Sequence, residues 1–207
     1  MSNCLELIES FGLRVSSVLH LGAHFGQEAK AYWEFGIRDA VFVEADPVTF
    51  EKLSNELKKY PGYRAVCALL ANIDDDLVNF YQASNSGLSS SALRPTGHLD
   101  KYKAIKFESI INLKTAKLDS ILNESFELIA LDVQGFELEV IRGGENTFRR
   151  AKVLWIEVSI GGLYAHDAKI EEVVSYLALL NFSLVNVNIN NKGWGDALFI
   201  RKDSLFH

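Results

Sequence analysis

Three acidic residues in this sequence, Glu44, Asp132 and Glu157, fall at or near the end of short apolar stretches that are typical of buried strands. In an open α/β sheet, ligands bind in the crevice outside the carboxyl ends of the strands. Carboxylates at such ends can accept hydrogen bonds from hydroxyl groups, take up a proton as a general base, or bind a cation through oxygen. We therefore expect one site at this edge of the sheet.

The element that would hold Glu44 begins with Ser17-Val-Leu-His-Leu-Gly-Ala-His-Phe-Gly26. This stretch predicts a strand over residues 18–21, a glycine turn, and a helix that starts near Gly26. A second apolar stretch, Ala40-Val-Phe-Val-Glu-Ala-Asp-Pro47, predicts the next strand. Glu44 lies twenty-two residues after Gly22, at a spacing where an acid can bind both hydroxyls of a ribose. Gly22 and Gly26 have no Cβ, so we expect the backbone there to approach a ligand closely.

The glycine spacing favours a nucleoside ligand without a pyrophosphate. A dinucleotide fingerprint would need glycine at the positions of His24 and Gln27, and the sequence has no Gly-Lys-Ser/Thr ending of a P-loop. S-adenosylmethionine fits this pattern, and a nicotinamide cofactor fits it least. The expected cofactor contacts are His20, Gly22, Ala23, His24, Gly26, Glu44, Ala45, Asp132 and Gln134. The alternative is a turn between strand and helix that binds no ligand.

Apolar strands and amphipathic helices alternate along the chain. This order predicts a single α/β domain over residues 1–207, with a mostly parallel sheet covered on both faces. We expect helices over residues 3–13, 27–35, 47–60 and 169–180 and one that ends at Gly143, and strands over residues 18–21, 40–46, 63–70, 77–81, 107–118, 127–132, 152–158, 182–189 and 197–200. The last two strands should form an antiparallel pair. Residues 1–16 are expected to cap the sheet edge with a helix.

Residues 83–103 form a long polar insertion with little periodicity, and such segments are often binding loops. The expected substrate contacts are Ser89, Ser90, Ser91, Arg94 and His98, with Trp194 from the last hairpin as a wall of the pocket. A flexible surface loop is the alternative. The run Asp74-Asp75-Asp76 is interpreted as a solvated turn rather than a metal site, because three adjacent acids on a turn do not converge on one point.

The composition narrows the class of partner. With a formal net charge of -6, the chain is not expected to hold nucleic acid by bulk charge. Cys4 and Cys67 stand in apolar surroundings and are interpreted as reduced core thiols of a cytoplasmic protein. The sequence has no secretory signal pattern and no apolar stretch of transmembrane length. We therefore expect a small-molecule or glycan acceptor as partner, and the oligomeric state stays open.

Four of these stretches together resemble the FkbM family of S-adenosylmethionine-dependent methyltransferases: His20–Gly26, Val43–Pro47, Leu131–Glu139 and Gly193–Ala197. The Ser89–Ser91 and His98 loop is similar to one branch of that family, and the resemblance covers roughly residues 17 to 202. It implies a Rossmann-like class I methyltransferase fold, with a seven-stranded sheet that ends in an antiparallel strand. It also implies methyl transfer to a hydroxyl oxygen, often on a sugar or a polyketide-type product. Many members carry Glu where this chain has Gln134.

A sugar hydroxyl is a poor nucleophile, so a base or a metal ion must help to remove its proton. Asp132 is the first candidate for the base, and the alternative is that it only caps the following helix. Glu157 and His98 are further catalytic candidates, and His166 is a second loop histidine of a type that titrates near neutral pH. Asp132 and Glu157, together with Glu137, could also bind Mg²⁺ through their oxygens.

The leading hypothesis is a cytoplasmic O-methyltransferase that acts on a carbohydrate or a glycosylated metabolite. A second hypothesis keeps the methyl transfer but has a peptide amide or another natural product as acceptor. A third, from a different class, is a catalytically silent module that kept the nucleoside-binding fold. The identity of the acceptor and the methylated position stay open at this level.

Overall fold

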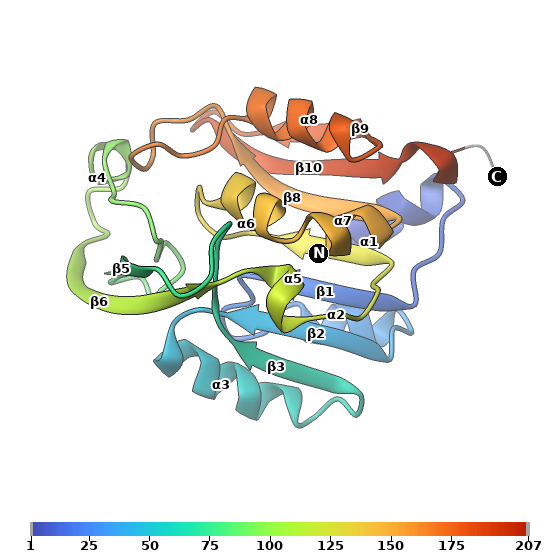
Figure 1. Ribbon diagram of the computed structural model, residues 1–207, viewed down its shortest axis with the longest axis horizontal. Coiled ribbons are helices and arrows are strands. Elements are labelled where there is room, and N and C mark those ends of the chain that lie inside the picture. The colour runs from blue at the N-terminus through green and yellow to red at the C-terminus, as the bar shows by residue number, and fades with distance from the viewer. Residues whose placement is uncertain (1, 206–207) are drawn as a thin grey trace.

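The computed structural model describes residues 2–205, and its centre is a sheet of seven strands (Figure 1). In spatial order these are β3 (Tyr63–Cys67), β2 (Asp39–Glu44), β1 (Ser17–Leu21), β7 (Leu128–Leu131), β8 (Val153–Ser159), β10 (Trp194–Arg201) and β9 (Phe182–Ile189). Neighbouring strands from β3 to β8 run parallel, and β10 runs antiparallel to both β8 and β9. The predicted seven-stranded, mostly parallel sheet with an antiparallel end is confirmed.

Helices cover both faces of this sheet (Figure 1). One face is covered by α1 (Ser2–Ser10), α2 (Ala29–Glu34) and α3 (Pro47–Leu57), and the other by α5 (Leu118–Ile121), α6 (Glu137–Gly143), α7 (Glu145–Arg150) and α8 (Ile170–Leu179). Successive strand side chains point to opposite faces, so Val18 packs on the α1 side and Leu19 on the α8 side. The completely buried Ile8 of α1 packs in the same cluster as Leu198 of β10. α1 therefore covers a sheet face instead of the edge that we expected.

A second, three-stranded sheet lies beyond the carboxyl ends of the main strands. It consists of β4 (Leu69–Leu70), β6 (Phe107–Ala116) and β5 (Leu77–Ala83), in that order. The sequence predicts one strand over residues 63–70, but the structure divides it at Ala68. The Ala68 N–H donates to the carbonyl of Glu44 at 3.0 Å, and β4 then leaves the main sheet to pair with β6. This exit places Leu69 and Leu70 above the end of β2.

The insertion at residues 83–103 is anchored at several points. Ser91 and Tyr81 exchange two backbone hydrogen bonds of 2.8 and 3.1 Å. A short helix, α4 (Gly97–Lys101), follows, and the His98 N–H donates to the carbonyl of Leu163 at 3.0 Å. These contacts tie the segment to β5 and to Leu163, and His98 lies in a helix.

Two further expectations have different outcomes. The Asp74 carboxylate accepts hydrogen bonds from the Lys117 N–H and the Ser120 hydroxyl, at 2.7 and 2.8 Å, which fits the predicted turn. Cys4 is buried as expected, but Cys67 is exposed, so the prediction of a second core thiol is wrong. Cys67 ends β3, where the chain turns away from the sheet.

Within residues 2–205, no helix combines the length and the apolar character that crossing a membrane requires.

Candidate functional site

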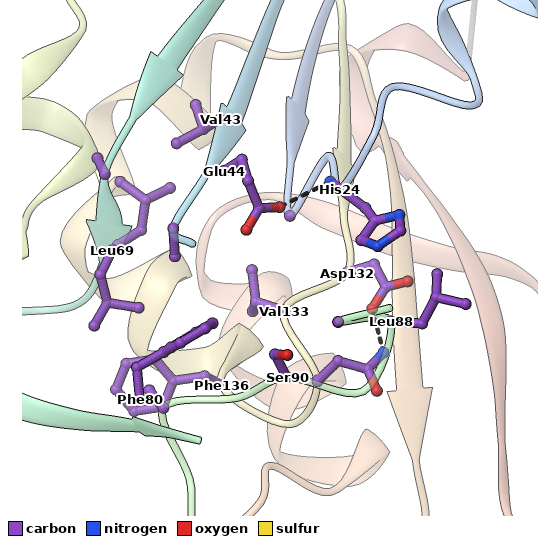
Figure 2. Close-up of a pocket in the computed structure, with 17 residues that line it drawn as sticks. His24, Val43, Glu44, Leu69, Phe80, Leu88, Ser90, Asp132, Val133 and Phe136 are labelled. Carbon is purple, nitrogen blue, oxygen red and sulfur yellow. Dashed lines mark hydrogen bonds between the residues drawn. The ribbon is translucent and has the colours of Figure 1, made fainter. Parts of the chain in front are cut away.

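Glu44 is the last residue of β2 and binds two backbone amides with its two carboxylate oxygens. Oε2 accepts from the His24 N–H and Oε1 from the Asp46 N–H, each at 2.8 Å (Figure 2 shows the bond to His24). Asp46 in turn caps α3 by accepting from the N–H groups of Val48 and Thr49. Burial raises the pKa of the Glu44 carboxyl, and the two amides oppose that rise. These contacts fix the carboxylate, while its remaining lone pairs stay available to a ligand.

The two glycines of the first turn, Gly22 and Gly26, both have a left-handed backbone. Gly22 has φ +80°, and a Cβ there would stand 1.7 Å from the backbone oxygen of Asp132. Gly26 has φ +76°, and its Cβ would meet the Leu53 side chain at 2.8 Å. Both glycines are thus required by neighbouring protein atoms, and only Gly22 also lines a cavity. Between them, the backbone of His24 has φ +47°, a value that residues other than glycine seldom adopt.

A first cavity opens beside Glu44, above the end of β2 (Figure 2). One side is apolar, with Val43, Leu69, Phe80, Val133 and Phe136, and the other carries the carboxylates of Glu44 and Asp132. Gly87, Leu88 and Ser90 of the insertion complete its lining. An apolar slot with a fixed carboxylate at its mouth suits a purine base joined to a ribose.

Three acidic side chains meet where β7 and β8 end. Asp132 follows β7, Glu157 lies near the end of β8, and Glu137 opens α6. Each offers a carboxylate oxygen, and these oxygens lie within 4.8 Å of one another. The sequence predicted this neighbourhood from the strand ends, and the structure confirms that the three acids are neighbours.

Gln134 links two of these acids. Its Nε2 donates to Asp132 Oδ1 at 2.7 Å and to Glu157 Oε2 at 2.9 Å, from a backbone with φ +55°. The Tyr164 hydroxyl donates its one proton to the Ser89 carbonyl at 2.8 Å, and its oxygen lies 3.3 Å from Gln134 Oε1. The amide therefore lies between the two carboxylates as a hydrogen-bond donor to both.

Crowding and burial change the titration of this cluster. Burial raises the pKa of Glu137 to about 7, although the N–H groups of Val133 and Gly135 oppose the rise. Burial, and then the charges of Asp132 and Glu137, raise the pKa of Glu157 well above its ordinary value. These effects favour the protonated form of Glu157.

A second cavity, of about 350 Å³, lies on the other side of Asp132. Its lining includes Asp132, Glu157, His98, Tyr164, Ser89 and Trp194. His98 is only 3% exposed, and its Nδ1 has no hydrogen-bond partner in the part of the chain that the structure describes. Burial lowers the pKa of His98, so the imidazole is neutral at pH 7. Trp194 donates its Nε1–H to the Tyr102 hydroxyl at 2.6 Å, which joins the last hairpin to α4.

The serines of the insertion divide between the two cavities. Ser90 lines the first cavity and Ser89 the second, while Leu88 lines both. Ser91 is buried and donates to the carbonyl of Gln134 at 2.8 Å, so it supports the acid cluster from behind. Arg94 is exposed and lines neither cavity, so the structure does not bring it to the site as predicted.

Several other predicted residues lie elsewhere. His20 is buried against Tyr32 and Phe42 on the α1 face and does not line the first cavity. Ala23 is 1% exposed and does not line it either, whereas Ala45 does. His166 is exposed and lines neither the first nor the second cavity, so it is no candidate base there. Side chains of β1 alternate between faces, which is why His20 points away from the strand ends.

The sequence analysis missed the apolar and aromatic lining of both cavities: Leu69, Phe80, Val133, Phe136, Tyr102 and Tyr164. In the sequence these residues are indistinguishable from ordinary core side chains. A partial signal existed for Tyr164, because Gly161-Gly162 precede it in a loop that follows a predicted strand end.

The fold and these stretches can be compared with known proteins. A family model described as the methyltransferase FkbM domain matches residues 20–184. The chain is also 25% identical, over 179 residues, to the 2-O-methyltransferase NoeI of Sinorhizobium fredii (strain NBRC 101917 / NGR234). That alignment covers 81% of this chain and 72% of NoeI.

Two solved structures illustrate the likeness of fold. The methyltransferase FkbM from Methylobacillus flagellatus KT has a TM-score of 0.61 at 13% identity, over 91% of this chain and 44% of that one. The chain thus spans less than half the length of that protein. An S-adenosylmethionine-dependent methyltransferase from Clostridium acetobutylicum ATCC 824 has a TM-score of 0.57 at 10% identity, over 96% of this chain and 89% of that one. The fold is that of class I S-adenosylmethionine-dependent methyltransferases.

Proposed function

The chain belongs to the FkbM family of S-adenosylmethionine-dependent methyltransferases, and from that membership we propose that it methylates a hydroxyl oxygen of a carbohydrate or glycosylated metabolite. One observation carries the proposal: Asp132 lines both the first and the second cavity. A cofactor in one cavity and an acceptor in the other would therefore meet at this carboxylate.

The lining of the first cavity supports its assignment to the adenosine part of the cofactor. Glu44 would accept hydrogen bonds from the ribose hydroxyls, because its carboxylate is already oriented by the amides of His24 and Asp46. Leu69 and Phe80 would pack on the adenine ring. The carboxylate of Asp132 would then face the positively charged sulfonium, which favours the bound form.

When bound, S-adenosylmethionine supplies an electrophilic methyl group. In the transfer, an acceptor oxygen forms a bond to that carbon as the carbon–sulfur bond breaks, and S-adenosylhomocysteine leaves. Held alignment of the two reactants can supply up to about 7–11 kcal/mol of the barrier. The hydroxyl proton passes to a base on the protein, and Asp132 is our candidate because it stands where the two cavities join.

Gln134 and Glu157 would position Asp132, and both line the second cavity beside it. The Gln134 amide holds one oxygen of Asp132, which orients the other. Burial and the neighbouring acids raise the pKa of Glu157, which disfavours a second negative charge beside Asp132. His98 is the alternative base, since its neutral ring lines the second cavity with Nδ1 unpaired among residues 2–205.

Mg²⁺ does not fit the arrangement of this acid cluster. The Gln134 Nε2–H₂ group lies between Asp132 and Glu157, and an amide nitrogen donates hydrogen bonds instead of ligating a hard cation. This amide already donates to the two carboxylates that a cation would have to bind. We therefore derive the reaction from Asp132 alone.

The second cavity supports a sugar as acceptor. Asn85, Ser89 and Asp167 provide hydrogen-bonding groups, and Trp194 provides an indole that can pack on the C–H face of a pyranose. The relative NoeI carries the name 2-O-methyltransferase, which agrees with a hydroxyl oxygen as the methyl acceptor.

The test is a transfer assay with S-adenosylmethionine that carries a radioactive methyl group, run against neutral mono- and oligosaccharides, a peptide library and aglycone natural products. Label in a sugar product, released as an O-methyl glycoside on hydrolysis, supports the proposal. Label only in a peptide or an aglycone would overturn the acceptor class. A folded protein that binds S-adenosylhomocysteine in calorimetry but never transfers label would be a silent binding module.

A further inference from the structure

A third cavity, of about 570 Å³, lies on the sheet face that carries α1, close to the carboxyl ends of β7 and β8. It shares Asp132, Glu157 and Trp194 with the second cavity, so the two cavities adjoin at these side chains. Its floor extends from β7 across β8 and β10 to the edge strand β9. None of the interactions described so far requires this space.

Strand register sets the composition of the floor. Asp196 of β10 is paired with Glu157 of β8 on one side and with Asn188 of β9 on the other. Residues paired across strands point to the same face, so these three form one polar row. In the neighbouring row, Leu198 is paired with Trp155 and with Asn186. The cavity therefore has a polar row beside an indole, all on the α1 side of the sheet.

From this lining we propose that the third cavity is a second sugar subsite, which holds a residue of the acceptor next to the one that is methylated. The inference rests on the proposed function, because it needs a glycan in the second cavity. It goes further, because it makes the acceptor an oligosaccharide or an extended glycoside.

The chemistry of the lining fits a pyranose. The indoles of Trp155 and Trp194 provide apolar surfaces that pack on C–H faces, while the Trp194 N–H is already donated to the Tyr102 hydroxyl. Asn186 and Asn188 are exposed, and their side-chain amides make no hydrogen bond to another described residue. Each amide offers both donors and acceptors to hydroxyl groups.

The charges of the lining select among sugars. Glu28, Asp132, Glu157 and Asp196 bring acidic groups to this cavity, and no lysine or arginine is among its described lining residues. A uronic acid or a phosphorylated sugar would bind less well here than a neutral sugar, because the carboxylates of Glu28 and Asp132 would repel its charge. The subsite is therefore one for a sugar residue without negative charge.

The test measures binding, so it does not depend on methyl transfer. Wild type and the double variant Asn186→Ala/Asn188→Ala are titrated, at saturating S-adenosylhomocysteine, with cello-, malto- and chito-tetrasaccharides, with their monosaccharides and with tetragalacturonate. Val187→Ala is the matched control, because Val187 is exposed on the same strand but alternation points it to the opposite face.

We expect one neutral tetrasaccharide to bind the wild type about 10-fold more tightly than its monosaccharide, a gain of the size of one or two hydrogen bonds. The double variant loses that gain and keeps its affinity for S-adenosylhomocysteine and for the monosaccharide, and Val187→Ala keeps all three. Tetragalacturonate binds less well than that neutral tetrasaccharide.

Four outcomes would overturn the subsite. No sugar binds, or the tetrasaccharide and the monosaccharide bind the wild type equally. Alternatively, the double variant still binds the tetrasaccharide more tightly than the monosaccharide, or it loses its affinity for S-adenosylhomocysteine. The last result would assign the cavity to the cofactor. Failure of the proposed function gives a different result. If the tetrasaccharide binds more tightly than the monosaccharide, this difference needs Asn186 and Asn188, and no label is transferred to sugars, the subsite is retained and the proposed activity is rejected. If label is transferred to a monosaccharide but the tetrasaccharide binds no more tightly, the proposed activity is retained and the subsite is rejected.

Discussion

The backbone oxygen of Asp132 lies where a side chain on Gly22 would have to begin: a Cβ built on Gly22 stands 1.7 Å from that oxygen. The contact joins the end of β1 to the end of β7, whose strands are paired in parallel from Val18 to Leu21. The Asp132 N–H also donates to the carbonyl of Leu21 at 3.0 Å. The first glycine turn and the candidate base are thus held together by backbone contacts.

This contact predicts that Gly22→Ala is far more damaging than an alanine at another left-handed glycine. Gly12 is the matched control, because it has φ +72° and open space where its Cβ would stand. Gly12→Ala should cost about 1 kcal/mol for the left-handed backbone alone. Gly22→Ala should cost about 2–3 kcal/mol more, because the Asp132 segment must move. Urea denaturation of both variants measures the difference, and equal losses would show that the contact is unimportant.

The ribose contact of Glu44 is tested by Glu44→Gln, which keeps one acceptor oxygen for the amides of His24 and Asp46. Calorimetry with S-adenosylhomocysteine should show a Kd raised about 10- to 100-fold, the size of losing charge-assisted hydrogen bonds. Glu51→Ala, which removes an exposed acid from α3, should bind like the wild type. If the affinity of Glu44→Gln is unchanged, Glu44 does not bind the ribose.

The assignment of the base is tested by comparing Asp132→Asn with His98→Gln. Asp132→Asn should lower kcat about 10²- to 10⁴-fold, the range for a lost general base, with a smaller change in the Kd of the cofactor. His98→Gln should lower kcat less than about 10-fold and leave the pH profile in place. The reverse order, with the acidic limb of the profile lost in His98→Gln, would identify His98 as the base.

Glu137 predicts a pH dependence of stability. Its pKa is raised from 4.5 to about 7 in the folded chain, so the folded state binds more protons than the unfolded one between these values. The stabilisation is fully present below about pH 4.5 and is lost as pH rises through about 7, a change of about 3 kcal/mol. In thermal melts, the melting temperature of Glu137→Gln should change less with pH over this window than that of the wild type. Glu139→Gln, on the same helix but half exposed and paired with Arg142, should keep the wild-type slope.

The position of Gln134 predicts that methyl transfer does not need a divalent cation. Activity after dialysis against EDTA should stay within about twofold of the untreated protein, because no step depends on a Lewis acid. Gln134→Glu is the informative companion, since it removes the amide donor and adds a carboxylate between Asp132 and Glu157. Loss of wild-type activity in EDTA, restored by Mg²⁺, would contradict the donor arrangement.

Much of this molecule follows from patterns that are local in the sequence. The strand over residues 18–21, the turn at Gly22, the acid at Glu44 and the proline that opens α3 all depend on neighbours within a few positions. The same holds for the alternation of strands and helices, which predicts the parallel sheet. Placing Asp132 and Glu157 at strand ends was enough to expect that they are neighbours.

Other features depend on which distant segments pack together. Local periodicity cannot reveal that Gly22 faces the Asp132 carbonyl, that Gln134 links two carboxylates, or that His98 is buried beside Tyr164. The pairing of Asn188, Asp196 and Glu157 is likewise set by the register of three strands. The sequence by itself determined the class of fold and the position of Glu44 at the end of its strand, because strand, turn and cap preferences act over a few residues. The tertiary structure decided which residues share a cavity, because register and loop packing bring together side chains far apart in the chain.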